Sequence, residues 1–198
     1  DDFEAIYNSE NQAGGFNSCM NDKGFEIFYN KCVDAKAASL WDNYGEMLAR
    51  CVIFTHVYDC DSSKVYRLAE RQYAQGENNA LKQILVNKLI ESGEIDGYKK
   101  VGASCHAPYM FVLNDGTSLS STDLCIDATN VVNYDKPYMD SFKYYNEEES
   151  RFYNSDDYNH THTAECTSGD MESIYSEYDD YHRCYCRETT IVYVWSPK

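Results

Sequence analysis

Polar and apolar positions in the first half of the chain follow the three- and four-residue spacing of helices. Asp34 is suited to cap a helix over residues 35–55, and a second helical run covers residues 64–75 before Gly76. Five side chains of the first run fall on one face: Leu40, Tyr44, Leu48, Cys51 and Thr55. The pattern therefore predicts two helices that face a core.

A third helix is predicted over residues 79–92, where the sequence is "NALKQILVNKLIES". Asn78 or Asn79 can cap its N-terminus, and Gly93 can end it. Its apolar stripe consists of Ala80, Ile84, Leu85 and Leu89. These positions are typical of an ordinary core-facing helix and show no cofactor-binding motif.

The pattern becomes extended after Gly97. Residues 109–120 contain two short runs around Asn-Asp-Gly at 114–116, which predicts a β-hairpin. Residues 123–134 are rich in β-branched side chains, and residues 189–195 alternate as a strand does. The chain is therefore expected to adopt an α+β fold, with N-terminal helices packed on a C-terminal antiparallel sheet.

Residues 134–182 hold few aliphatic side chains and many tyrosines and acids, so we expect long acidic loops there. Residues 1–18 are polar and are expected to form an arm. We find no internal repeat and no linker rich in proline or glycine. The sequence therefore predicts a single domain over residues 1–198.

Charge narrows the classes of partner. The formal net charge is −16; residues 1–100 carry 16 acids and 11 bases, and residues 101–198 carry 17 acids and 6 bases. Such a chain is repelled by nucleic acid and by anionic lipid. No apolar run is long enough to cross a bilayer. Basic proteins or cations are the expected partners.

Nine cysteines are spread along the chain without a CxxC motif. This usage predicts a secreted, extracellular protein stabilised by up to four disulfides, with one cysteine left to be buried or to link two chains as a dimer. The start at Asp1 suits a mature secreted chain, and Asn159 heads a glycosylation sequon.

Catalytic and metal motifs are scarce. Cys105 and His106 are adjacent, which does not make a dyad, and we assign no catalytic residue, cofactor or metal. His160, His162, Cys166, Cys184 and Cys186 can be imagined as zinc ligands, but their spacing is irregular. One alternative left open is a secreted hydrolase that uses His106 or His56 together with acids from elsewhere.

The stretch "YSEYDDYHRCYC" at 175–186 combines acids, tyrosines and cysteines. The stretch "NSDDYNH" at 154–160 is a weaker echo of its acids and tyrosines. In the first stretch, "EYDDYHRC" resembles the extracellular N-terminal segments of chemokine receptors, which are acidic, rich in tyrosine and bind small basic chemokines. The resemblance implies a secreted decoy of the chemokine-binding protein class. The implied partner-binding residues are Tyr175, Glu177, Tyr178, Asp179, Asp180, Tyr181, Asp156, Asp157 and Tyr158.

The physical chemistry of these side chains agrees with that expectation. Carboxylates pair with arginine and lysine, while tyrosine rings offer apolar area and cation–π contacts. The summed negative field accelerates encounter with a basic ligand. The remaining alternative is a tyrosine-rich matrix protein that is cross-linked through the odd cysteine.

Overall fold

The computed structural model describes residues 3–18, 20–24, 26–105, 107, 110–119, 123–129, 140–155, 184–185 and 191–192. Its strands are β1 (Ala35–Trp41), β2 (Met47–Asp59), β3 (Lys64–Ala69), β4 (Tyr73–Ala74), β5 (Gly97–Lys99), β6 (Phe111–Leu113), β7 (Ser118–Leu119), β8 (Leu124–Asp127), β9 (Tyr144–Asn146), β10 (Arg151–Tyr153), β11 (Cys184–Tyr185) and β12 (Ile191–Val192). Its helices are α1 (Phe3–Tyr7), η1 (Ser9–Asn11), α2 (Glu26–Lys31), η2 (Gln75–Glu77) and α3 (Asn79–Glu91).

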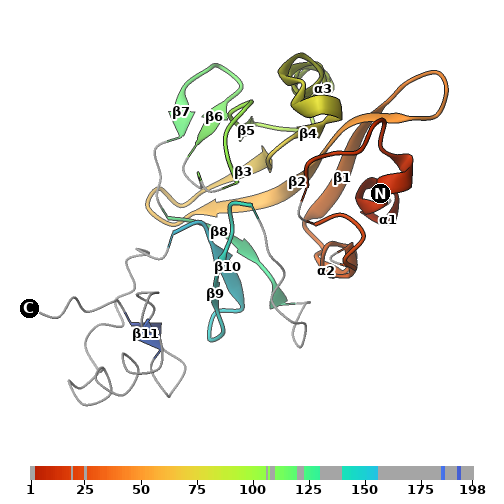
Figure 1. Ribbon diagram of the computed structural model, residues 1–198. Coiled ribbons are helices and arrows are strands. Elements are labelled where there is room, and N and C mark those ends of the chain that lie inside the picture. The colour runs from red at the N-terminus through yellow and green to blue at the C-terminus, as the bar shows by residue number, and fades with distance from the viewer. Residues whose placement is uncertain are drawn as a thin grey trace, which may run out of the picture.

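Ten of these strands form one curled sheet with the shape of a half-barrel (Figure 1). The strand order is β7-β6-β5-β3-β2-β8-β10-β9, and β1 and β4 pair with β2 outside this path. The sheet is mixed, because β3 and β5 run parallel while the other pairs are antiparallel. Strands β11 and β12 pair only with each other.

The long strand β2 organises the sheet. Its N-terminal half pairs with β1 and β4, and its C-terminal half pairs with β3 and β8. Between Phe54 and Val57 the register against β3 shifts, which makes Thr55 and His56 a bulge. The bulge bends the strand and so helps the sheet to curl.

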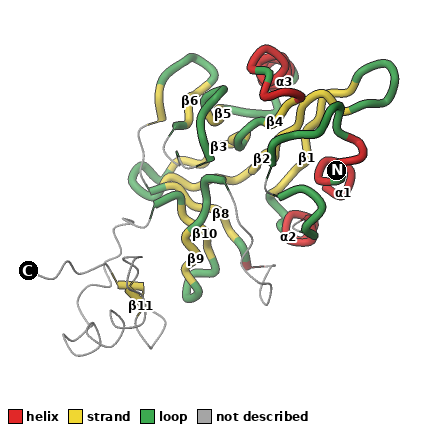
Figure 2. Tube along the Cα trace, viewed as in Figure 1, coloured by secondary structure: helices red, strands yellow, loops and turns green. Residues whose placement is uncertain are grey.

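Helices cover both faces of β2. Ala49, Cys51 and Ile53 belong to a cluster with Leu85 of α3, whereas Val52 and Phe54 pack with residues of α1 and α2. This division follows the two-residue alternation of side chains along a strand. In the tube view, the three short α-helices are distributed around a body made mainly of strands and loops (Figure 2).

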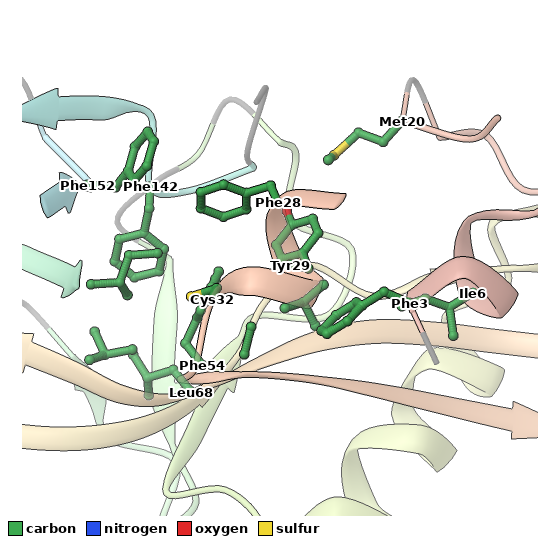
Figure 3. Packing of buried hydrophobic residues seen from close by; sticks show 14 of the residues in the cluster. Phe3, Ile6, Met20, Phe28, Tyr29, Cys32, Phe54, Leu68, Phe142 and Phe152 are labelled. Atoms are coloured by element: carbon green, nitrogen blue, oxygen red, sulfur yellow. The ribbon is translucent and has the colours of Figure 1, made fainter. Parts of the chain in front are cut away.

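The larger core is rich in aromatic rings. Phe28 and Tyr29 of α2 lie between the sheet and α1, close to Phe54 of β2 (Figure 3). Phe3 stacks on Tyr29 with ring centroids 5.2 Å apart, and Phe28 meets Phe152 edge to face at 5.5 Å. These contacts hold the N-terminal helices against the concave side of the sheet.

The predicted fold of N-terminal helices on a C-terminal sheet is wrong. Residues 35–41, 47–59 and 64–69 are strands, and only the third predicted helix exists, as α3. Strand β2 is buried on both faces over residues 49–54. Periodicity alone cannot assign a continuous apolar run of this kind to a helix or a strand. The apparent helical spacing therefore led to the wrong prediction of a helix over residues 35–55.

The expectation of a fold stabilised by disulfides is also overturned within the described residues. Cys32, Cys51, Cys60, Cys105 and Cys125 are all free thiols there. The half-barrel instead gains stability from apolar burial, since 34 hydrophobic residues of the described part are buried. Side chains of the other four cysteines lie outside the described residues.

Other local expectations fared better. The hairpin at Asn114-Asp115-Gly116 is confirmed, because β6 and β7 pair on either side of it. Residues 124–127 are extended as β8, and Asn78 caps α3 by accepting from the Ala80 amide at 2.9 Å. The segment expected as a polar arm instead places Phe3, Ile6, Tyr7 and Phe16 in the core.

Candidate functional site

The nine partner-binding residues predicted from the sequence, Asp156 to Tyr158 and Tyr175 to Tyr181, lie outside the described residues, as does Asn159. His106, His160, His162, Cys166 and Cys186 lie outside them too. The search for a site therefore turns to the described body.

An acidic cluster occupies the end of β2 where it meets β8. We use the name β8 acidic cluster for Asp59, Asp61, Asp123 and Glu149. Strand β2 ends opposite β8, with Asp59 facing Leu124, and the Cys60 amide donates to the Asp123 carbonyl at 3.0 Å. This pairing brings the turn after β2 next to the start of β8.

Mutual repulsion is evident at the centre of this cluster. The pKa of Asp123 is raised to about 6, first by partial burial and then by the charges of Asp61, Asp59 and Glu149. A carboxyl among like charges resists ionisation, and a nearby cation relieves the repulsion. The cluster is thus a place where a lysine or arginine of a partner is electrostatically favoured.

Two members of the β8 acidic cluster also have local roles. Asp59 accepts from the amides of Asp61 and Ser62 at 3.1 and 3.2 Å, which closes the turn after β2. Glu149 accepts a hydrogen bond from the Tyr153 hydroxyl. Asp61 is exposed to solvent, and Asp123 and Glu149 are partly exposed.

The described segment 140–155 ends beside this cluster. Asn154 donates its amide to the Leu124 carbonyl at 2.9 Å, and its side-chain oxygen accepts from the Leu124 amide at 2.8 Å. The described segment 140–155 ends at Ser155, and the predicted Asp156 and Asp157 are the next residues in the sequence. The last residues of this segment therefore lie beside the start of β8, which Asp123 precedes.

His56, the described histidine of the hydrolase hypothesis, lies in the bulge of β2. Its Nδ1 is 2.8 Å from Asp34 Oδ1 and 3.1 Å from the Thr55 hydroxyl. A serine-type triad needs the acid and the nucleophile on opposite ring nitrogens. Here both neighbours share Nδ1, so the geometry orients His56 without activating Thr55.

A second polar group is fully enclosed. The Lys99 ammonium donates to the Ser141 hydroxyl at 2.8 Å, and that hydroxyl donates to Glu70 Oε1 at 2.6 Å. Burial raises the pKa of Glu70, and the charge of Lys99 opposes that rise. Neither Lys99 nor Ser141 has measurable solvent exposure. No substrate can reach Ser141 in this state, so the contact tethers residues 140–141 to β5.

Arg50 fixes the N-terminal segment in a comparable way. Its guanidinium lies between the rings of Tyr7 and Tyr73, 4.4 and 4.7 Å from their centroids. It donates to Ser18 Oγ at 2.9 Å and to Asn21 Oδ1 at 2.8 Å. A buried arginine with these partners is a structural group and contributes nothing to the outer charge.

Exposed acidic side chains outnumber exposed basic ones in the described part of the chain. Ten acids with described side chains are exposed, against six bases, and all six of those bases are lysines. The four described arginines are buried or partly buried: Arg50, Arg67, Arg71 and Arg151. Residues 156–198 add nine acids and three bases to the chain. The net charge can be read from the sequence, whereas the partial burial of the arginines is seen only in the structure.

The described residues contain neither a metal-binding set of side chains nor a helix that could span a membrane. No three side chains among their histidines, cysteines and acids converge as a metal-binding set. None of their helices combines the length and the apolar character of a bilayer span. Compared with known proteins, the chain matches no family model, no curated protein and no solved structure at a significant level.

Proposed function

We propose that this protein is a secreted binding protein that captures basic extracellular proteins, with chemokines as the class that its acidic tyrosine motif indicates. The observation that carries the proposal is the segregation of charge. Arg50 is buried and the other described arginines are only partly exposed, while ten acids and six lysines are exposed in the described part. A stable, acidic exterior attracts basic partners over a distance and orients them during encounter.

The β8 acidic cluster supports a location for this capture. Asp61, Asp123 and Glu149 retain solvent access, and their repulsion raises the pKa of Asp123. A partner cation placed among them gains Coulomb attraction and lowers that pKa. The next acids in the chain, Asp156 and Asp157, follow Ser155 directly.

The acidic tyrosine-rich region supplies the remaining contacts in this proposal. Tyr175, Tyr178 and Tyr181 alternate with Glu177, Asp179 and Asp180. Tyrosine faces contribute apolar area and cation–π attraction, and the intervening acids pair with lysine and arginine. Binding in this mode occupies the basic surface by which a chemokine engages its receptor.

A charge-matched pair of variants tests the location. The first variant combines D61N, D123N and E149Q in the β8 acidic cluster, and the control combines E4Q, E10Q and E46Q at exposed sites elsewhere. Each removes three negative charges. We expect the first to slow association with a chemokine roughly three- to tenfold at low salt and the control to slow it much less. Equal effects would show that only the overall field matters.

A second variant tests the motif itself. D179N with D180N should slow association more than it accelerates dissociation, because exposed charges act mainly on encounter. Stopped-flow or surface plasmon resonance measurements at two salt concentrations separate the two rates. An unchanged association rate in this variant would contradict the assignment of residues 175–181.

A further inference from the structure

Cys60 and Cys125 are neighbours in the sheet although 65 positions separate them in the chain. Cys60 follows the last residue of β2, and Cys125 lies within β8, where it faces Tyr58 of β2. Their sulfur atoms are 3.6 Å apart, which is a thiol–thiol contact and not a covalent bond. This is a pair of cysteines held together by strand pairing.

The two thiols differ in accessibility and in charge. Cys60 is exposed, whereas Cys125 is fully buried. The pKa of Cys125 is lowered, first by its hydrogen bond with the Cys60 thiol and then by the nearby charge of the Arg151 guanidinium. The pKa of Cys60 is raised by the same shared proton and by partial burial. Exposure makes Cys60 the sulfur that a small disulfide can reach, and the 3.6 Å contact lets Cys125 accept its proton.

Other described cysteines lack this arrangement. Burial raises the pKa of Cys51 to about 12 and that of Cys32 to about 11, so both thiols stay protonated near neutral pH. A protonated, buried thiol is a poor nucleophile. Cys32 and Cys51 therefore serve as unreactive controls for Cys60 and Cys125 within the same protein.

We propose that Cys60 and Cys125 form a redox site that reacts with small-molecule disulfides and closes as an intramolecular disulfide. The inference rests on the contact between β2 and β8 and does not depend on the proposed function. A disulfide bond is about 2.05 Å long, so the sulfurs must approach by about 1.5 Å from their 3.6 Å separation. The turn that follows β2 carries Cys60 and can supply this movement.

The reaction proceeds in two exchanges. With Cys125 as a thiolate, the exposed Cys60 sulfur attacks a disulfide RSSR while its proton passes to Cys125; Cys60 bonds to one sulfur and releases RS⁻. Cys125, again deprotonated, then attacks the Cys60 sulfur and expels the second RS⁻. The two released thiolates take up the two protons. Overall, two protein thiols are oxidised to one disulfide, and RSSR is reduced to two RSH.

The probe is oxidised glutathione. It is added to the reduced full-length protein at pH 8, and the reaction is quenched with acid. Chymotrypsin cuts after tyrosine and leucine, so Cys60 falls in peptide 59–66 and Cys125 in peptide 125–134, apart from Cys51 and Cys105. We expect these two peptides to become linked, with loss of two hydrogen atoms. The oxidised protein should also unfold at a higher urea concentration than the reduced one.

Two variants distinguish the proposed order of events. C125A should stop the reaction after the first exchange and retain one glutathionyl group on Cys60. C60A, altered at an exposed position, should yield neither the linked peptides nor a glutathionyl group on Cys125. Cys51 and Cys32 should stay unmodified in all proteins.

Peptide mapping of the wild-type protein after reaction with oxidised glutathione can overturn the proposal by itself, even if C125A does not fold. Persistent glutathionylation of Cys60 without a link to Cys125 would contradict it. A link from Cys60 to any other cysteine would contradict it as well.

Discussion

Folding shifts the pKa values of two carboxyl groups, those of Asp123 and Asp115, in opposite directions. The pKa of Asp123 is raised to about 6 by partial burial and neighbouring acids. The pKa of Asp115 is lowered because the Thr117 amide donates to it at 2.8 Å. The raised group favours its protonated form in the folded state, so its contribution to stability falls as the pH rises from about 4 to about 6.

This contrast yields a pH-dependent prediction. D123N should raise the melting temperature at pH 7.5, because it removes a charge that the folded state disfavours, and should change it little at pH 4. D115N should lower the melting temperature at pH 7.5, with an effect that fades as the pH falls below the usual aspartate range. Thermal unfolding followed by circular dichroism measures both. A destabilised D123N at pH 7.5 would contradict the account of the β8 acidic cluster.

The enclosed contact among Lys99, Ser141 and Glu70 gives a second prediction at the residue scale. K99M removes the only cation within ion-pair distance of the buried Glu70 in the described part, at 3.6 Å. A buried charge without its partner costs roughly 3–5 kcal/mol of folding free energy. The double variant K99M/E70Q should recover part of this loss, because the Gln amide can still bond Ser141. Urea unfolding that shows K99M no less stable than the double variant would contradict this role.

At the scale of elements, the short central strand β5 depends on a glycine. A Cβ atom added to Gly97 would lie 2.7 Å from the Val112 carbonyl oxygen of β6 and 3.1 Å from a Leu68 methyl. Backbone atoms of a neighbouring strand cannot yield without loss of pairing. The close approach of β5 and β6 therefore requires the absence of a side chain.

G97A should lower the free energy of unfolding by roughly 1–3 kcal/mol, the usual cost of overpacking. G116A is the comparison, since its Cβ would meet no atom within 4 Å and only its left-handed φ of 86° opposes the change, at about 1 kcal/mol. Hydrogen exchange in β6 should accelerate in G97A alone. Hydrogen exchange in β6 that is no faster in G97A than in G116A would contradict the close approach.

Elements differed in how far the sequence could predict them. Helix α3 was predictable because Asn78 and Gly93 mark its ends in the sequence. The turn between β6 and β7 was predictable for the same reason, since its Asn-Asp-Gly signal is local. Strands β1 to β3 were not, because the burial of β2 on both faces depends on α3 and on the N-terminal helices, which no local pattern shows.

At the scale of the whole molecule, the excess of acid was predictable and its distribution was not. Arg50 is enclosed by Tyr7 and Tyr73, and Arg67 pairs with Asp96 at 2.5 Å. Such pairings arise from tertiary contacts between distant segments. The contact between Cys60 and Cys125 was equally unpredictable, because nine cysteines permit many pairings and strand order selects this one.

The most direct test of the central claim is the binding of the protein to a panel of chemokines, with lysozyme as a basic control, at two salt concentrations. Surface plasmon resonance should show nanomolar affinity for several chemokines, weak affinity for lysozyme and association rates that fall with salt. Equal binding to every basic protein would reduce the site to a nonspecific field. No binding across the panel would contradict the proposed function and direct attention to His56 and a hydrolase screen.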